Sequence, residues 1–210
     1  MSNTRTISAI ILLAIGLLGD AGQTVITTVS EGPGTATTGT TAPAEITIRN
    51  ETDNQQPVEI VDWAVERYEL AGLRLPAGEI VFYPFDPSLD DCAGHGGLHT
   101  VGEGGHRIDI CAVGVPSRRR LMLHEFAHAW THETLSQGQL DAFLSMRGLE
   151  NWNDPDSDWD QRGTEHASEI ITWGLNRRCD PRHMLQDENH DSLAAAFELL
   201  TGTEPLCQPG

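Results

Sequence analysis

Residues 121–130, LMLHEFAHAW, form an apolar stretch that contains three polar side chains, His124, Glu125 and His128. A buried helix loses free energy for each polar group that it leaves without a partner. Positions i and i+4 lie on one face of a helix, so the two histidines project together, about 6 Å apart. The three residues are therefore either incidental or a site on a half-buried helix with an apolar back.

The spacing of the two histidines suits a metal ion. Two imidazole nitrogens placed in this way can bind one Zn²⁺, at about 2.0–2.1 Å each. The chain contains 9 histidines in 210 residues, and only roughly 0.03 HExxH matches are expected by chance. We interpret His124 and His128 as ligands of one Zn²⁺ per chain. Glu125 lies beside them and is interpreted as the catalytic general base toward a zinc-activated water.

A third ligand is needed, and it does not come from the same helix. The pattern HExxHxxGxxH is absent because residues 131 and 134 are both threonine, which excludes the metzincin arrangement. His132 continues the i+4 series but lies about 12 Å from His124 along the helix axis, too far to share its metal. We interpret His132 as a polar residue at the helix end.

The better candidates lie in RGTEHASEIITWGL, residues 162–175. Glu165 and Glu169 are one turn apart on one face of a predicted helix, among apolar neighbours. Buried carboxylates need cations or donors to stay charged. Zinc would satisfy Glu165, and the Nδ1–H of a ligating histidine would satisfy Glu169. The alternative is that Glu165 and Glu169 lie on a solvent-exposed acidic face of the helix and bind no metal.

HEFAH followed by E-x-x-x-E on a downstream helix resembles the gluzincin metallopeptidases, the thermolysin-like class, whose pattern is HExxH followed by E-x-x-x-D. The resemblance covers about residues 117–175 and implies that His124, His128 and Glu165 bind zinc and that Glu125 is the base. It implies Glu169 in place of the family's aspartate. The Gly-Thr-acid run is also similar to the aspzincin pattern GTxD.

The resemblance also implies a zincin-like domain, with a small, mostly antiparallel sheet packed on the HExxH helix and followed by helices. In such a domain the peptide substrate lies along an edge strand, for which the resemblance indicates residues 106–112. The predicted order of elements is itself typical of an α+β domain. Hydrophobic periodicity and turn residues predict strands at 79–85, 97–101 and 106–113, and helices at 58–71, 117–133, 136–147, 165–176 and 191–201.

The first 57 residues differ from the rest in composition. Residues 1–21 contain Arg5 and then the apolar run 7–19, which is too short for a membrane span of about 20 residues but is typical of a signal peptide. A short buried helix and an uncleaved anchor that tethers the chain to a membrane are the alternatives. Residues 22–57 are rich in Thr, Gly, Pro and Ala and predict a flexible linker with a short extended piece at 45–49, and the folded domain is predicted at 58–210.

Four cysteines form an even set in a chain that carries an export signal, so two disulfides are expected. Three connectivities are open; Cys92–Cys111 and Cys179–Cys207 are favoured because each pair brackets one local segment. A cysteine zinc site is the alternative, but the sequence has no CxxC pair.

Charge and motif together favour one functional class. The net charge of −18 excludes a nucleic-acid partner that needs a basic face. We expect a secreted or cell-surface zinc metallopeptidase that hydrolyses peptide bonds, and the alternative is a non-catalytic, zinc-containing surface binding module. An oxyanion donor is also expected, and the paired histidines of GHGGLH (94–99) are interpreted as loop residues of a hairpin turn. The sequence does not choose among the available donors, Tyr83, His106, His166, Arg182, His183 and His190.

Overall fold

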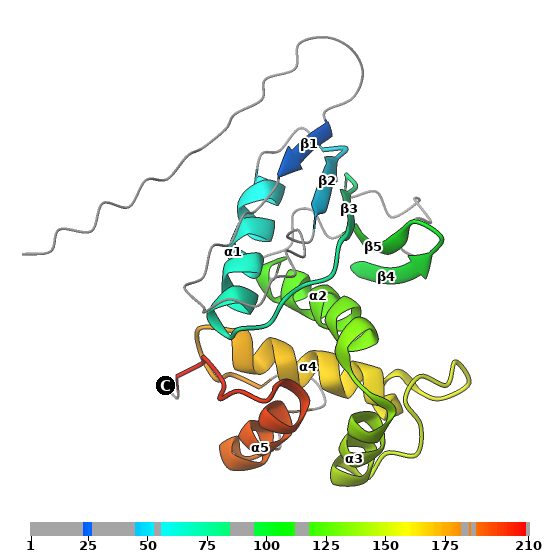
Figure 1. Cartoon of the computed structure of the whole chain (residues 1–210), viewed down its shortest axis with the longest axis vertical. Coiled ribbons are helices and arrows are strands. Elements are labelled where there is room, and N and C mark those ends of the chain that lie inside the picture. The colour runs from blue at the N-terminus through cyan, green and yellow to red at the C-terminus, as the bar shows by residue number, and fades with distance from the viewer. Residues whose placement is uncertain are drawn as a thin grey trace, which may run out of the picture.

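The computed structural model describes residues 45–52, 56–84, 95–111, 118–181, 185 and 188–208, and the backbone of 23–26. The predicted signal segment 1–21 and Cys92 lie outside these ranges. The described elements form an α+β domain, as the sequence predicts (Figure 1). In chain order they are β1 (Gln23–Ile26), β2 (Ile46–Asn50), α1 (Gln56–Leu70), β3 (Gly78–Phe82), β4 (Gly97–Gly102), β5 (Gly105–Ile110), α2 (Arg118–Thr134), α3 (Gln137–Arg147), the 3₁₀ helix η1 (Trp159–Gln161), α4 (Gly163–Leu175) and α5 (His190–Thr201).

The sheet is mixed, so the expectation of a mostly antiparallel sheet is wrong. Its strand order is β1-β2-β3-β5-β4. The three inner strands β2, β3 and β5 run parallel, and the two outer strands β1 and β4 pair antiparallel with their neighbours. The physical reason is α1, which lies between β2 and β3 in the chain, because parallel neighbours need a crossover connection.

Strand β2 lies inside the stretch 22–57 whose composition predicts a flexible linker. Ile46 is 8% exposed and Ile48 only 1%, because alternate residues of the strand face the core. The folded domain therefore includes the end of that stretch. A second correction concerns residues 106–112: β5 pairs with β3 on one side and with β4 on the other, so the edge strand on this side of the sheet is β4.

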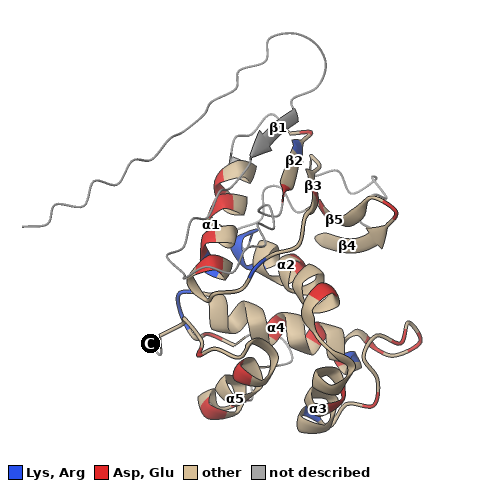
Figure 2. Ribbon diagram, in the orientation of Figure 1, with Lys and Arg blue, Asp and Glu red and all other residues tan. Residues whose placement is uncertain are grey.

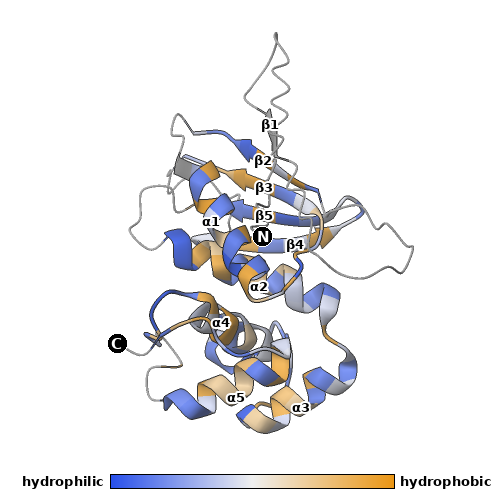
Figure 3. Cartoon of the chain, turned by 60° about the vertical axis from the view of Figure 1, so that its left-hand side comes forward, coloured by the Kyte–Doolittle hydropathy of each residue, from blue (hydrophilic) through white to orange (hydrophobic). Residues whose placement is uncertain are grey.

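Helix α2 is the centre of the molecule. It lies between the sheet and α4, with α3 and α5 beyond α4 (Figure 1). Hydrophobic residues lie along β3 and in bands on the helices (Figure 3), and the buried ones form a single cluster that joins sheet and helices. The hydroxyl of Tyr68 on α1 is buried and donates to the carbonyl oxygen of Leu123 on α2, at 3.0 Å, which fixes the two helices to each other.

Local capping explains both ends of α3 and the start of α5. The Ser136 hydroxyl caps α3 by accepting from the backbone N–H of Gln139, and the Gln139 side chain accepts from the backbone N–H of Ser136. Gly148 ends the helix in the left-handed conformation. Asn189 caps α5 through the Ser192 amide. The helix predicted at 165–176 begins earlier, at Gly163, so that Thr164 lies in the first turn of α4.

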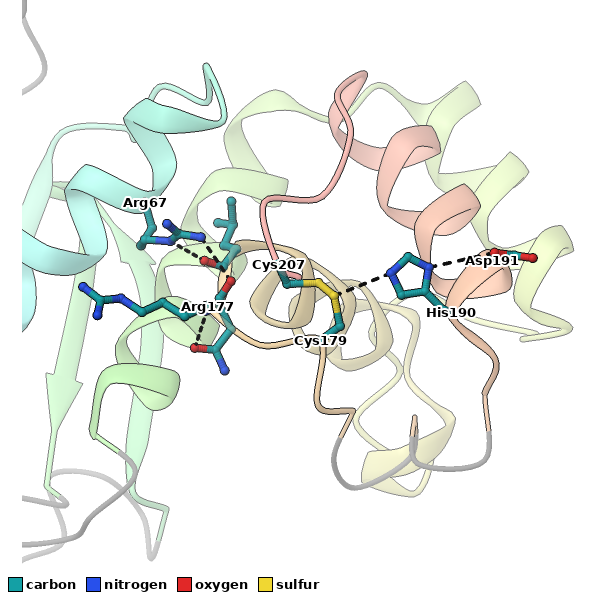
Figure 4. Close-up of a disulfide and its surroundings, with 8 residues drawn as sticks. Arg67, Arg177, Cys179, His190, Asp191 and Cys207 are labelled. Carbon is teal, nitrogen blue, oxygen red and sulfur yellow. Dashed lines mark hydrogen bonds and ion pairs between the residues drawn. A yellow bond between two sulfur atoms is a disulfide. The ribbon is translucent and has the colours of Figure 1, made fainter. Parts of the chain in front are cut away.

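The end of α4 is fixed by two features (Figure 4). The guanidinium of Arg67 donates to the carbonyl oxygens of Leu175 and Asn176 at the C-terminus of the helix, where a positive charge is favourable. Just beyond it, Cys179 and Cys207 form a disulfide, which confirms that predicted pair. The predicted pair Cys92–Cys111 includes a residue outside the described ranges and stays a prediction.

Acidic side chains are distributed over the outer helices, and the arginines of residues 118–120 gather at the start of α2 (Figure 2). Over the described part of the chain, no helix has both the length and the apolar character needed to cross a membrane.

Candidate metal centre

His124, His128 and Glu165 meet where α2 crosses α4. The Nε2 atoms of the two histidines are 3.1 Å apart, and Oε2 of Glu165 lies 3.2 Å from the first and 3.4 Å from the second. Tetrahedral ligands at about 2.0–2.1 Å from a zinc ion lie about 3.3 Å from one another. The three ligand atoms therefore form a triangle of the size that one zinc ion requires.

The second nitrogen of His124 faces a carboxylate, as predicted for Glu169. Nδ1 of His124 lies 3.2 Å from Oε1 of Glu169, although out of line for a full hydrogen bond. The other carboxylate oxygen pairs with the guanidinium of Arg120, a residue that the sequence did not single out. Glu169 is thus a buried link between an arginine and a ligand histidine, and the side chains of Glu169 and Arg120 are 5% and 11% exposed.

The second nitrogen of His128 faces two hydroxyls. Its Nδ1 lies 3.1 Å from Oγ1 of Thr164 and 3.1 Å from Oγ of Ser168, both on α4. A hydroxyl that accepts the Nδ1 proton leaves the Nε2 lone pair free for a metal. The outer contacts of both histidines therefore favour the tautomer that can bind zinc.

Charge at the site is set by burial and by these neighbours. Burial alone lowers the pKa of His124, but its contacts with Glu165 and Glu169 outweigh burial and raise that pKa to about 10. Burial alone would raise the pKa of Glu165, yet the two histidines hold it well below its usual range. Without a metal, the site therefore holds a protonated histidine against an ionised carboxylate.

Glu125 is buried beside this triangle without belonging to it. The residue is 4% exposed, and burial raises the pKa of its carboxyl despite the neighbouring histidines. Gly97 of β4 is pressed against it: a Cβ added at Gly97 would lie 2.6 Å from Oε1 of Glu125. The strand therefore needs a glycine here for the glutamate to keep its position.

A pocket of about 570 Å³ lies over these residues. One wall is the start of β4, the floor is α2 and α4, and the segment 152–162 forms the other wall. Trp159 of that segment stacks over His124 with ring centroids 6.4 Å apart. The pocket therefore opens onto Glu125 and onto the candidate ligands His124, His128 and Glu165.

A second group of histidines lies next to the first, between the end of α2 and the β4–β5 hairpin. His99 was interpreted as a loop residue, but it lies in β4, and its ring stacks parallel to that of His128 at 6.3 Å between centroids. Burial and the neighbouring histidines lower the pKa of His99 to about 3, so its ring is neutral. His106 on β5 and His132 on α2 complete the group.

The remaining donor candidates lie elsewhere or are already bonded. The hydroxyl of Tyr83 accepts from Arg107, and Nε2 of His166 lies 2.9 Å from the carbonyl oxygen of Asp160. His190 lies beside the disulfide. Arg182 and His183 are outside the described residues.

Searches against protein-family models, curated proteins and solved structures find no match to this chain.

Proposed function

We propose that this chain is an exported zinc-dependent metallopeptidase. The observation that carries the proposal is the triangle of His124, His128 and Glu165, with edges of 3.1–3.4 Å, beside a buried glutamate at the floor of an open pocket. These are the residues for which the gluzincin resemblance implies the same roles.

The residues of the site divide the chemistry between them. A bound zinc ion supplies Lewis acidity, which polarises a substrate carbonyl and acidifies a water molecule. Glu125 then takes the proton of the attacking water and passes it to the leaving amine nitrogen. Burial supports this role, because the raised pKa of Glu125 brings it nearer to the pH at which it must accept and release a proton.

The proposal includes a zincin-like arrangement of the site-bearing half of the domain, with β4 as the strand that binds the substrate. Three features support it: α2 lies under the sheet, α4 places Glu165 beside the two histidines, and β4 is an edge strand along the pocket. An edge strand offers unpaired backbone groups to an extended peptide. The Cys179–Cys207 disulfide supports export, because disulfides persist in oxidising compartments.

The alternative of a structural zinc in a binding module is less well supported. Structural zinc sites usually have four protein ligands, whereas catalytic sites keep one position open. Among the described residues, no fourth histidine, cysteine or carboxylate joins His124, His128 and Glu165.

The test is Glu125→Gln, which keeps the size of the side chain and removes the base. Zinc content is measured by inductively coupled plasma mass spectrometry, and turnover with a broad peptide library. We expect one tightly bound zinc in both wild type and variant, and a loss of peptide hydrolysis by a factor of roughly 10² or more, the range for removal of a general base.

The matched control is Glu198→Gln on the exposed side of α5, which should hydrolyse peptides like wild type. Wild-type hydrolysis that survives Glu125→Gln unchanged would reject the mechanism. Zinc binding without any hydrolysis of the library would favour the binding module.

A further inference from the structure

The end of α2 carries a second set of metal-ligand side chains. His132 and Glu133 follow His128 by one helical turn, and they face His106 on β5. Nε2 of His106 lies 3.5 Å from Oε2 of Glu133. Each of His106, His132 and Glu133 offers one ligand atom, and these atoms all lie within 4.8 Å of one another.

The orientation of His106 suits a ligand. It is 8% exposed, and its Nδ1 lies 2.9 Å from Nε2 of His99. When Nδ1–H of His106 donates to His99, the lone pair of Nε2 is left facing Glu133. This is the relation between a ligating histidine and its outer hydrogen-bond partner in metal sites, with His99 in the place that Glu169 takes for His124.

We propose that His106, His132 and Glu133 form a second site for a divalent transition metal. Two imidazoles and one carboxylate suit Zn²⁺, Co²⁺, Ni²⁺ or Cu²⁺, whereas Ca²⁺ and Mg²⁺ prefer sites made of oxygen atoms alone. The site shares no ligand with the first one. It joins the β4–β5 hairpin to the end of α2, and it does not depend on whether the chain is a peptidase.

Binding requires a small closure of the site. The ligand atoms lie within 4.8 Å of one another, compared with about 3.3 Å around a tetrahedral zinc ion. His106 is held in place by its strand, whereas His132 and Glu133 are exposed, the Glu133 side chain by 64%. Rotation of these two side chains brings their atoms toward His106 without moving the backbone.

The test is a zinc titration of the full chain after its metal has been removed. Bound zinc is counted by mass spectrometry after equilibrium dialysis, and affinities come from calorimetry. We expect two equivalents in wild type, one tight and one weaker. Removing an outer partner of a metal ligand weakens binding by about 10–100-fold, so His132→Ala should weaken the second equivalent by at least about 100-fold and leave the first unchanged.

Two further variants separate this site from the first. Glu133→Gln replaces an exposed carboxylate by an amide and is expected to fold. It should weaken binding of the second zinc equivalent as His132→Ala does. In His124→Ala the first equivalent is lost and the weaker one remains. Glu103→Gln, in the exposed turn of the same hairpin, is the control and keeps both. A single equivalent in wild type, or a second equivalent unaffected by both His132→Ala and Glu133→Gln, would overturn the proposal.

Discussion

In the middle of α2, the side chains of His124 and His128 are 11% and 13% exposed and lie against α4, whereas His132 and Glu133 at the end of the same helix are exposed and face a hairpin. The first pair has its ligand atoms at zinc spacing before any metal is bound. The second pair has a single buried partner, His106, and must change rotamers to close.

The difference in exposure between these two pairs shows what packing contributes to a candidate metal site. Folding has already ordered the side chains of the first site, and Glu165 and Glu169 compensate their burial. The second site must order two exposed side chains on binding, and fixing such a side chain costs up to about 2 kcal/mol. We therefore expect the same residue types on one helix face to give a tight site where two helices cross and a weaker site where the helix ends.

The largest expected effect comes from removing the third ligand of the first site. Four ligands of a structural zinc site together supply about 10–16 kcal/mol, or roughly 3 kcal/mol each. Glu165→Ala should therefore weaken the tight zinc equivalent by roughly 10²-fold or more and leave the weaker one unchanged. Competition with a chromophoric chelator measures this, and full retention of tight zinc would mean that Glu165 is not the third ligand.

Glu169→Ala should have a smaller effect on the same equivalent. Glu169 contacts Nδ1 of His124 and the guanidinium of Arg120, and loss of such an outer partner weakens metal binding by about 10–100-fold. The same chelator competition applies. If Glu169→Ala lost more zinc than Glu165→Ala, the two carboxylates would have to exchange roles.

Substitutions at two glycines of β4 test the packing around Glu125 without changing a candidate metal ligand. A Cβ at Gly97 would meet Glu125, whereas a Cβ at Gly102 has open space around it. Gly97→Ala should lower the free energy of unfolding by about 1–3 kcal/mol, as overpacking does, and reduce hydrolysis with zinc retained. Gly102→Ala should stay within about 0.5 kcal/mol of wild type. Urea denaturation checks both, and equal behaviour of the two variants would contradict the close packing on Glu125.

The smallest expected effect is the number of protons released when zinc binds. The pKa of His124 in the metal-free site is raised to about 10, so its ring is protonated at pH 7, and zinc must displace that proton from Nε2. Binding of the tight equivalent should release about one proton from His124. Calorimetry in buffers of different ionisation enthalpy measures it, and zinc uptake at pH 7 with no proton release would show that His124 is neutral.

The sequence predicted the local features well and the long-range ones only in part. The HExxH helix, the limits of α3 and α5 and the facing pair Glu165 and Glu169 follow from spacing and capping, which are properties of one segment. The parallel centre of the sheet was missed because the sequence predicts β2 only as a short extended piece within a Thr-rich linker, not as a strand of the sheet. Only pairing with β3 reveals that its two isoleucines belong to the core.

Partners that come from distant segments had no signal in the sequence. Arg120 precedes the motif by one helical turn but meets Glu169 only because α4 crosses α2. In the sequence, Gly97 is one of several glycines of a predicted hairpin. Its contact with Glu125 depends on how β4 lies over α2. His132 was interpreted as a helix-end residue because the spacing to His124 excludes a shared metal. The sequence alone does not show that β5 places His106 beside His132.

The fixed end of α4 has a consequence for the motions of the domain. Arg67 holds the last carbonyl groups of the helix, and the Cys179–Cys207 disulfide, with a sequence separation of 28 residues, ties the following segment to the end of the chain. The C-terminal end of α4 is therefore not free to unwind, and we expect the amides of its last turn to exchange with deuterium only in larger openings of the domain. Reduction of the disulfide should therefore appear first as faster deuterium uptake in the last turn of α4.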